Sequence, residues 1–195
     1  TRGCDAPAGT IPGSSSLTIV FDPPSQLGFK ENVQRGDLLI DEVTRLTRTL
    51  LPGTVVLEGD VVASDLAWVI NAGNWSHTRK VDIHGMRAAT FTLATLEPFE
   101  RLIDLDLSSN HLTALFAEPQ FNLSRPFPQA GQMQSVNLNH NLLSALPEAT
   151  RGMSVLHTLK ITHNQITQLK RDDLVTLDTL VELDLEHNFI STVEA

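Results

Sequence analysis

The chain has 195 residues, of which 41% are hydrophobic, and a formal net charge of −9. It is long enough to bury one sizeable core, and its acidic balance argues against binding to nucleic acid or to an anionic membrane. It contains no run of about 18 apolar residues that could insert into a membrane. The first residues, Thr1 to Cys4, lack the apolar core of a signal peptide, which indicates a mature or trimmed product or a cytosolic protein.

Residues 1–50 are predicted to form an N-terminal capping region. A strand-like run at 17–21 is stopped by Pro23 and Pro24, which cannot donate to a ladder. A helix is predicted over 37–50 because apolar residues recur there at spacings of four, three and four, at Leu39, Val43, Leu46 and Leu50. We expect this edge strand and helix to cover the open end of the structure that follows.

Two imperfect repeat units follow, in the spacing of the template L-x-x-L-x-L-x-x-N-x-L. The first places Val55, Leu57, Asp60 and Val62 at template positions. A helix over 65–72 is predicted after it, with Ser64 as its N-cap and with Trp68 and Ile70 packed beneath it. The second unit has Val81, Ile83, Met86 and Ala88 at the same positions. Since Met86 replaces the Asn, we expect an irregular turn there.

Four near-complete copies of the template begin at Leu102, Met133, Leu156 and Leu180, and their Asn residues are Asn110, Asn141, Asn164 and Asn188. Alternation of apolar and polar residues in each copy predicts a short, half-buried strand. One such coil cannot bury its apolar side, so the coils must stack into a parallel sheet. The Asn amide can satisfy backbone groups in the turn, and we assign all four Asn residues to architecture.

The long interval between the first two copies carries an insertion, residues 116–132, which we expect to loop outward. The sequence ends at Ala195, directly after the last copy, and no capping segment follows. Terminal repeats normally need a polar outer face. We therefore expect either a longer protein or self-association through the uncapped C-terminal end.

The template resembles the leucine-rich repeat family. The spacing of Leu96, Phe99 and Leu102, which recurs at Leu174, Leu177 and Leu180, is similar to its animal extracellular type, found in Toll-like receptor ectodomains and insect adhesion or immune proteins. Over residues 51–195 the resemblance implies an α/β solenoid. This is a horseshoe with a parallel β-sheet on its concave face and short helical or irregular return segments.

The outward strand positions are the predicted partner-binding surface, because solenoids commonly bind through this face. We expect a protein ligand or co-receptor to meet mainly acidic side chains there. The candidate residues are Lys80, Asp82, His84, Asp104, Asp106, Asn137, Asn139, Lys160, Glu182, Asp184 and Glu186.

Three histidines, His140, His163 and His187, each precede a template Asn and should stack at strand spacing. They could form a pH-sensing or metal-binding ladder, or they could simply occupy a solvent-facing position. Zinc would need a further ligand of suitable geometry, so no metal site or cofactor is predicted.

Two features bear on the compartment. The sequons at Asn74 and Asn122 indicate a glycosylated, secreted or cell-surface protein, in which the single Cys4 would pair with another chain. The alternative is a cytosolic scaffold or inhibitor, which a lone cysteine also suits. No catalytic motif is present, and the preferred function is extracellular protein recognition by a receptor, adhesion or innate-immunity protein rather than catalysis.

Overall fold

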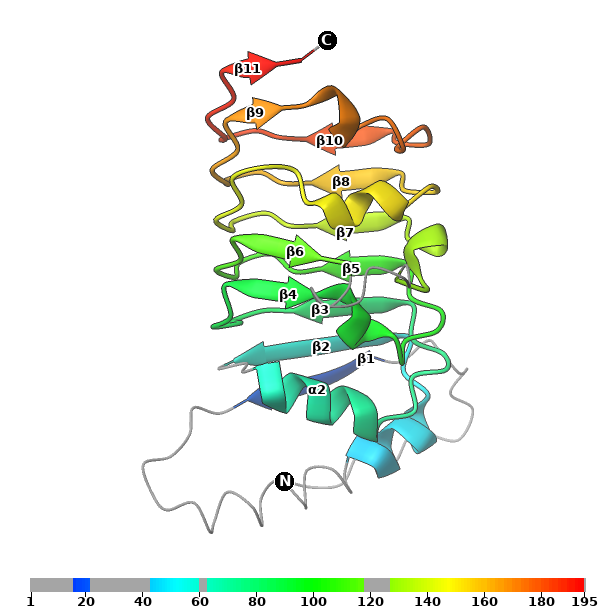
Figure 1. Ribbon diagram of the computed structural model, residues 1–195. Coiled ribbons are helices and arrows are strands. Elements are labelled where there is room, and N and C mark those ends of the chain that lie inside the picture. Colours follow the sequence, from blue (N-terminus) through cyan, green and yellow to red (C-terminus); the bar gives the residue numbers. More distant parts are fainter. Residues whose placement is uncertain (1–15, 22–42, 60–62, 118–126, 195) are drawn as a thin grey trace.

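The computed structural model describes residues 16–21, 43–59, 63–117 and 127–194. Their main feature is one seven-stranded parallel sheet, with the strand order β1-β2-β3-β5-β7-β8-β10. Figure 1 shows the coils stacked one above another along the chain, each contributing one strand to this sheet. The α/β solenoid predicted from the repeats is confirmed.

The main strands are short and keep the same register throughout. Their outward residues Lys80, Asp104, Ser135 and Thr158 are successive Cα partners. The alternation of buried and partly exposed residues in β2, β3, β5, β7 and β8 is the pattern expected of a half-buried strand. The bounds are β1 Ser16–Phe21, β2 Thr54–Gly59, β3 Lys80–Ile83, β5 Asp104–Asp106, β7 Ser135–Asn137, β8 Thr158–Lys160 and β10 Glu182–Asp184.

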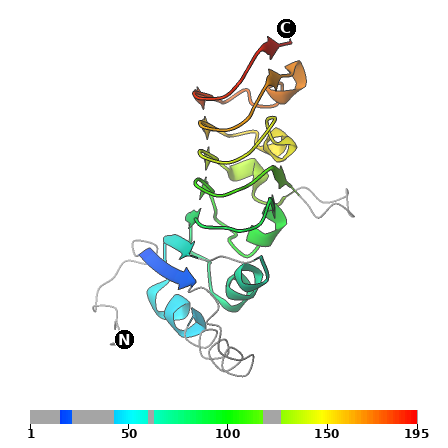
Figure 2. The ribbon, with the colours of Figure 1, turned by 90° about the vertical axis from the view of Figure 1, so that its left-hand side faces the viewer.

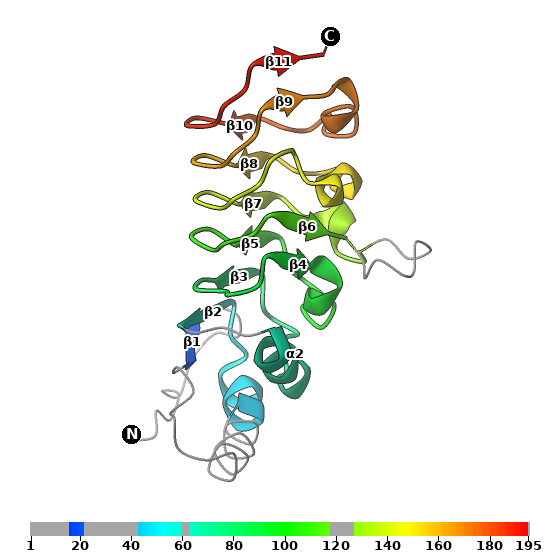
Figure 3. The ribbon, with the colours of Figure 1, turned by 60° about the vertical axis from the view of Figure 1, so that its left-hand side comes forward.

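The return half of each coil lies on the side opposite the main sheet, where Figures 2 and 3 show a column of short helices. Single turns of 3₁₀ helix predominate, as predicted for the return segments, and short strands pair in two small parallel sheets, β4 with β6 and β9 with β11. The helices are α2 Ala63–Ala72, η1 Leu93–Leu96, η2 Ala130–Gln132, η3 Glu148–Gly152 and η4 Arg171–Asp173. The strands are β4 Thr90–Thr92, β6 Ala114–Phe116, β9 Gln168–Leu169 and β11 Thr192–Val193.

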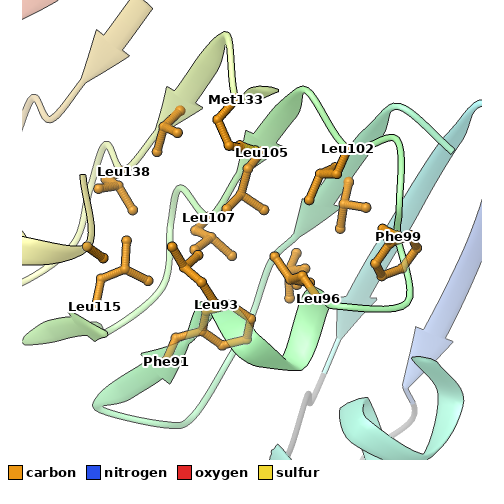
Figure 4. Close-up of a cluster of buried hydrophobic side chains, with 14 of the residues drawn as sticks. Phe91, Leu93, Leu96, Phe99, Leu102, Leu105, Leu107, Leu115, Met133 and Leu138 are labelled. Atoms are coloured by element: carbon orange, nitrogen blue, oxygen red, sulfur yellow. The ribbon is translucent and has the colours of Figure 1, made fainter. Parts of the chain in front are cut away.

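The core lies between the main sheet and the return segments. Figure 4 shows Leu105 of β5 and Leu107, just after this strand, facing Leu93 and Leu96 of η1 across this space. Phe99 and Leu102 close the coil and are fully buried, so the predicted return-path spacing holds in this coil. Because each coil has room for only one such layer of side chains, the core is continuous only through the stacking of neighbouring coils.

The template asparagines form a ladder inside the turns, as predicted, and Asn110, Asn141 and Asn164 are buried while Asn188 is partly exposed. In each case the side-chain amide donates to a carbonyl of its own coil and to one of the preceding coil; for Asn164 these are the carbonyls of Ile161 and Leu138. Its Oδ1 accepts from the N–H of Leu143, at 3.0 Å. The amide thus satisfies bent backbone that no strand ladder reaches.

At the N-terminal end, β1 is the edge strand of the sheet and pairs with β2, as predicted. The described part of the predicted helix spans residues 43–50; residues 37–42 lie outside the described residues. The division into a cap of residues 1–50 and a repeat region of residues 51–195 stays a prediction.

Two expectations for helix α2 were wrong. The helix begins at Ala63, so Ser64 lies inside its first turn rather than before it. Trp68 is 41% exposed, while Ile70 is buried as predicted. The aromatic ring in the core beside the helix is instead Trp75, whose Nε1 donates to the Ile70 carbonyl at 2.6 Å.

The turn at Met86 keeps the backbone direction of the other turns, because Gly85 adopts a left-handed φ of 78°. A Cβ at this position would also collide with the carbonyl oxygen of Gly59. Both the backbone conformation and the lack of space therefore require glycine here. The Asn110 Oδ1 accepts from the N–H of Met86 itself, at 2.6 Å. In the later turns the donor lies two residues beyond the template Asn. The irregularity predicted here therefore concerns the hydrogen bonding and not the path of the chain.

The last coil is much more exposed than the others. Leu183, Leu185 and Ile190 pack against the core but are only partly buried, and Leu174 is 38% exposed. Val181 is 84% exposed, at the template position that holds the exposed Gln134 and His157 in the two preceding coils.

Candidate recognition surface

The outward strand positions form one continuous surface, here called the exposed sheet face, on the side of the sheet away from the helices (Figure 3). All eleven candidate partner-binding residues lie on it and are partly or fully exposed. Thr162 lies two residues beyond the end of β8 and, unlike these candidates, is buried, with 8% of its surface exposed. The sequence therefore located the members of this face correctly, with one buried threonine at its margin.

Several polar side chains on the exposed sheet face accept hydrogen bonds from backbone N–H groups just beyond the ends of their own strands. The Oδ1 of Asp106 accepts the N–H of Ser108 at 2.8 Å, and Asp184 accepts the N–H of Glu186 in the same way at 3.1 Å. Asn137 does the same for Asn139. These side chains satisfy N–H groups where the strand ladder ends, so part of the apparent acidity is architectural.

Ion pairs neutralise another part of the charge. Lys80 lies 3.3 Å from Asp82, and Lys160 lies 3.2 Å from Glu182 on the neighbouring strand. Both pairs are well exposed on at least one side and contribute little to stability.

The carboxylates left for a partner are those of Asp104 and Glu186. Neither makes a side-chain hydrogen bond or an ion pair within the part of the chain that the structure describes. Asp104 lies at the start of β5 and Glu186 lies just beyond β10. The free acidic groups of the face are therefore set far apart.

Asp82 is the least solvated carboxylate of the face. Its side chain is 14% exposed, and its Oδ1 is buried without a hydrogen-bond partner among the described residues. Burial raises the pKa of the Asp82 carboxyl above its ordinary value, against the opposing effect of the nearby Lys80 ammonium, and Asp106 adds to the rise. The folded chain therefore binds the Asp82 proton more tightly than the unfolded chain does, and ionisation of this carboxyl destabilises the fold.

Beside this face, the predicted histidine stack is present. The rings of His140 and His163 lie 4.2 Å apart between centroids and are nearly parallel, and His163 and His187 are spaced by the same 4.2 Å. All three residues adopt a left-handed backbone, which the sequence analysis did not foresee. The signal was available, because Gly85 occupies the matching template position.

The stack does not suit a metal ion, because the lone pairs of stacked rings run parallel and do not converge on one point. In the described residues, no group of three His, Cys, Asp or Glu side chains is arranged to hold a metal. Asn74 is exposed, with its Oδ1 accepting the N–H of Ser76 at 3.3 Å. Cys4 and Asn122 lie outside the described residues. Among the described residues, no helix is long and apolar enough to cross a membrane.

Comparison with known proteins gives one family match and several distant similarities. In an alignment of 115 positions that covers 52% of this chain, the sequence is 26% identical to a protein of Dictyostelium discoideum named as a probable serine/threonine-protein kinase. The chain spans only 9% of that protein's length.

Two solved structures are similar in shape. An internalin of Listeria monocytogenes gives a TM-score of 0.49 at 18% identity, covering 77% of this chain and 43% of the internalin. The leucine-rich repeat ectodomain of a plant membrane receptor kinase from Arabidopsis thaliana, solved with Casparian strip integrity factor 2, gives 0.37 at 17% identity. That likeness covers 89% of this chain and 23% of the ectodomain.

The family match falls on the most regular part of the chain. Residues 131–190 match the family model described as leucine rich repeat. This stretch contains β7, β8 and β10 and three rungs of the asparagine ladder. Residues 131–190 are therefore leucine-rich repeats, and the parallel solenoid to which they belong is a leucine-rich repeat fold.

Proposed function

We propose that this chain is an extracellular protein-recognition module that binds a protein partner through its exposed sheet face. The observation that carries the proposal is the face itself, a continuous polar surface on five strands that no described helix covers. Solenoids of stacked repeats commonly use such a surface for binding. Its short strands hold the outward side chains in fixed register, which suits recognition without rearrangement.

The carboxylates without an ion pair or side-chain hydrogen bond indicate which charges a protein partner would contact. Asp104 and Glu186 are available for intermolecular contacts, whereas Asp106 and Asp184 are occupied with backbone N–H groups. Exposed charges of this kind mainly set the association rate and its dependence on salt. A partner with a basic contact surface fits this face best.

The test measures association of a protein captured by the parent chain from secreted proteins and then purified. We expect Asp104→Lys and Glu186→Lys to slow its association, because they reverse the free charges without removing a backbone hydrogen bond. The matched control is Asp172→Lys, an exposed carboxylate in η4 on the opposite side, which should leave the rate unchanged. If both face variants associate at the parent rate and affinity, binding occurs elsewhere.

The extracellular assignment rests on the exposed sequon at Asn74 and on the sequon at Asn122. Expression in secretory cells followed by glycopeptide mass spectrometry tests it, with Ser76→Ala as the control that removes the Asn74 sequon. A glycan on Asn74 of the natural protein supports secretion. A natural protein recovered from the cytosol without glycan at either asparagine would favour the alternative, a cytosolic scaffold or inhibitor.

We also propose that the isolated chain associates through its last coil. The apolar residues Leu183 and Leu185 are partly exposed there, and β10 has a paired neighbour, β8, on one side only. An edge strand with bare apolar side chains is a template for pairing. Sedimentation velocity across a concentration series should show a rising mass that Leu183→Lys lowers. A concentration-independent monomer contradicts the proposal.

A further inference from the structure

The stacked histidines lie at the contacts between the last coils rather than on isolated turns. The backbone N–H of His140 donates to the carbonyl of Thr162 at 2.9 Å, and that of His163 donates to Glu186 at 3.0 Å. His140 and His163 therefore each join their own coil to the next coil through the backbone. The same residues touch each other through their rings, at 4.2 Å between centroids.

The backbone fixes the direction of the rings. His140, His163 and His187 have φ values of 56°, 54° and 56°, and Ser109 occupies the matching position in the preceding coil with 56°. Few side chains tolerate this region, and Asn, Asp and His are the commonest that do. The coil spacing set by the sheet therefore keeps the three histidines on neighbouring turns, where their rings stack.

The surroundings of the column include both signs of charge. Around His163 the like charges are His140 and His187, one on each neighbouring coil, and the opposite charges are Glu186 and Asp184 of the last coil. Thr162 offers the only close polar contact that the structure describes for the His163 ring, with its Oγ1 3.3 Å from Nδ1. The acidic groups flank only the end of the column nearest β10.

The balance of these effects lowers the pKa of His163 below its ordinary value, first through loss of hydration and then through the two neighbouring imidazoles. The unfolded chain therefore takes up this proton at a higher pH than the folded chain. The stability that this residue contributes is present above the ordinary histidine pKa and is lost as the pH falls through the lowered pKa of the folded state.

We propose that the column of His140, His163 and His187 is a pH-sensitive contact that holds the last three coils together when neutral and loosens them when protonated. Neutral rings stack favourably, whereas adjacent imidazolium rings at this separation repel each other. Earlier coils carry Gly85 and Ser109 at the matching positions and lack this response. Acidification therefore opens the C-terminal coils and leaves the rest of the solenoid closed.

Hydrogen exchange of the full chain tests the proposal at the Ile161 N–H, which donates to the Asp184 carbonyl between β8 and β10. Protection, corrected for intrinsic exchange, should fall by about fivefold from about pH 7.5 to about pH 5, the factor expected for two unit charges about 4 Å apart in water. In the same spectra the Leu107 N–H, which donates to Asn137, should change little. Equal protection of Ile161 at both pH values overturns the proposal.

Matched variants distinguish protonation of the histidine column from protonation of other groups in the protein. His163→Asn removes the central ring while retaining a residue that tolerates the left-handed backbone, and it should abolish the loss of protection. His157→Asn, an exposed histidine of the same coil outside the column, should keep the parent response. Persistence of that response in His163→Asn, or its disappearance in His157→Asn, overturns the proposal.

A gain of response gives an independent test. Ser109→His places a fourth ring at the matching left-handed position next to His140, since the Ser109 N–H donates to Asn139 of the same neighbouring coil. The acid-induced loss of protection should then extend to that N–H. If this variant folds and shows no added response, stacked imidazoles do not control the contact between coils.

Discussion

Strands β8 and β10 have the same template and different environments. In β8 and the turn after it, Leu159 and Ile161 are 0% exposed, whereas the equivalent Leu183 and Leu185 remain partly exposed. The side chains are of the same kind, so the motif alone does not bury them. Burial depends on having a packed coil on both sides.

The hydrogen bonds of the two turns behave differently from the apolar side chains. Asn188 donates to the carbonyls of Ile161 and Leu185, and Asn164 makes the equivalent pair of bonds. Both therefore bond within their own coil and back to the preceding coil. The Asn188 amide therefore makes the full set of bonds to its own and the preceding coil, even though the apolar core of the last coil is incomplete.

The largest test of this comparison is a matched pair of core truncations. Ile161→Ala should destabilise the fold by about 2–5 kcal/mol, because packed coils on both sides cannot collapse around the gap. Leu107→Ala should cost as much. Leu185→Ala, at the same template position in the last coil, should cost about 1 kcal/mol because water already reaches it. Urea midpoints measure all three, and equal losses at Ile161 and Leu185 would show that the following coil does not supply the burial.

The second test applies to the asparagine ladder. Asn164→Ala should cost about 3 kcal/mol, because it leaves buried carbonyl and N–H groups of two coils without partners. Asn188→Ala should cost about 1 kcal/mol, since water can replace an amide that is partly exposed. Gln165→Ala, an exposed neighbour, is the control. Denaturant unfolding that ranks Asn188 above Asn164 would contradict this prediction.

The outward positions allow a smaller test of the same contrast. Asp82 and Asp184 share a template position, but the strand of Asp82, β3, has a neighbouring strand on each side. The pKa of Asp82 is raised above the ordinary 3.8. The folded state thus binds this proton more tightly, and stability is lost as pH rises through the raised pKa. Asp82→Asn should stabilise the protein by about 1 kcal/mol near neutral pH and by nothing near pH 3.

Thermal melts over this pH range measure the effect, with Asp184→Asn as the control. Since Asp184 accepts the N–H of Glu186, its substitution should give no gain. A neutral-pH gain for the control that matches the gain for Asp82 would assign the effect to net charge rather than to burial.

The smallest effect is expected for the ion pair that joins the two strands. Lys160 and Glu182 are 39% and 50% exposed, so Lys160→Met should change stability by less than about 0.5 kcal/mol. Double-mutant analysis with Glu182→Gln measures the coupling. A coupling well above this value would mean that the ion pair, and not the apolar core, fixes the last coil to β8.

Local pattern was enough to predict most of the solenoid. The alternation in Asp104–Asp106 and its copies specifies short strands, and the recurring Asn specifies the turns. Stacking, strand order and the histidine column then follow, because a repeated coil can bury its apolar side only against its own copy. The edge strand near residue 17 was also predictable, since two prolines follow this apolar run in the sequence.

The sequence alone did not determine which side chains are free to act. That Asp106 is used by a backbone N–H while Asp104 is free depends on where the ladder ends in space. The exposure of Trp68 and the burial of Trp75 depend on how α2 is placed against the core. The template determined the coil, whereas burial, charge state and availability were decided by tertiary neighbours, because each of these properties belongs to a pair of adjacent coils rather than to one.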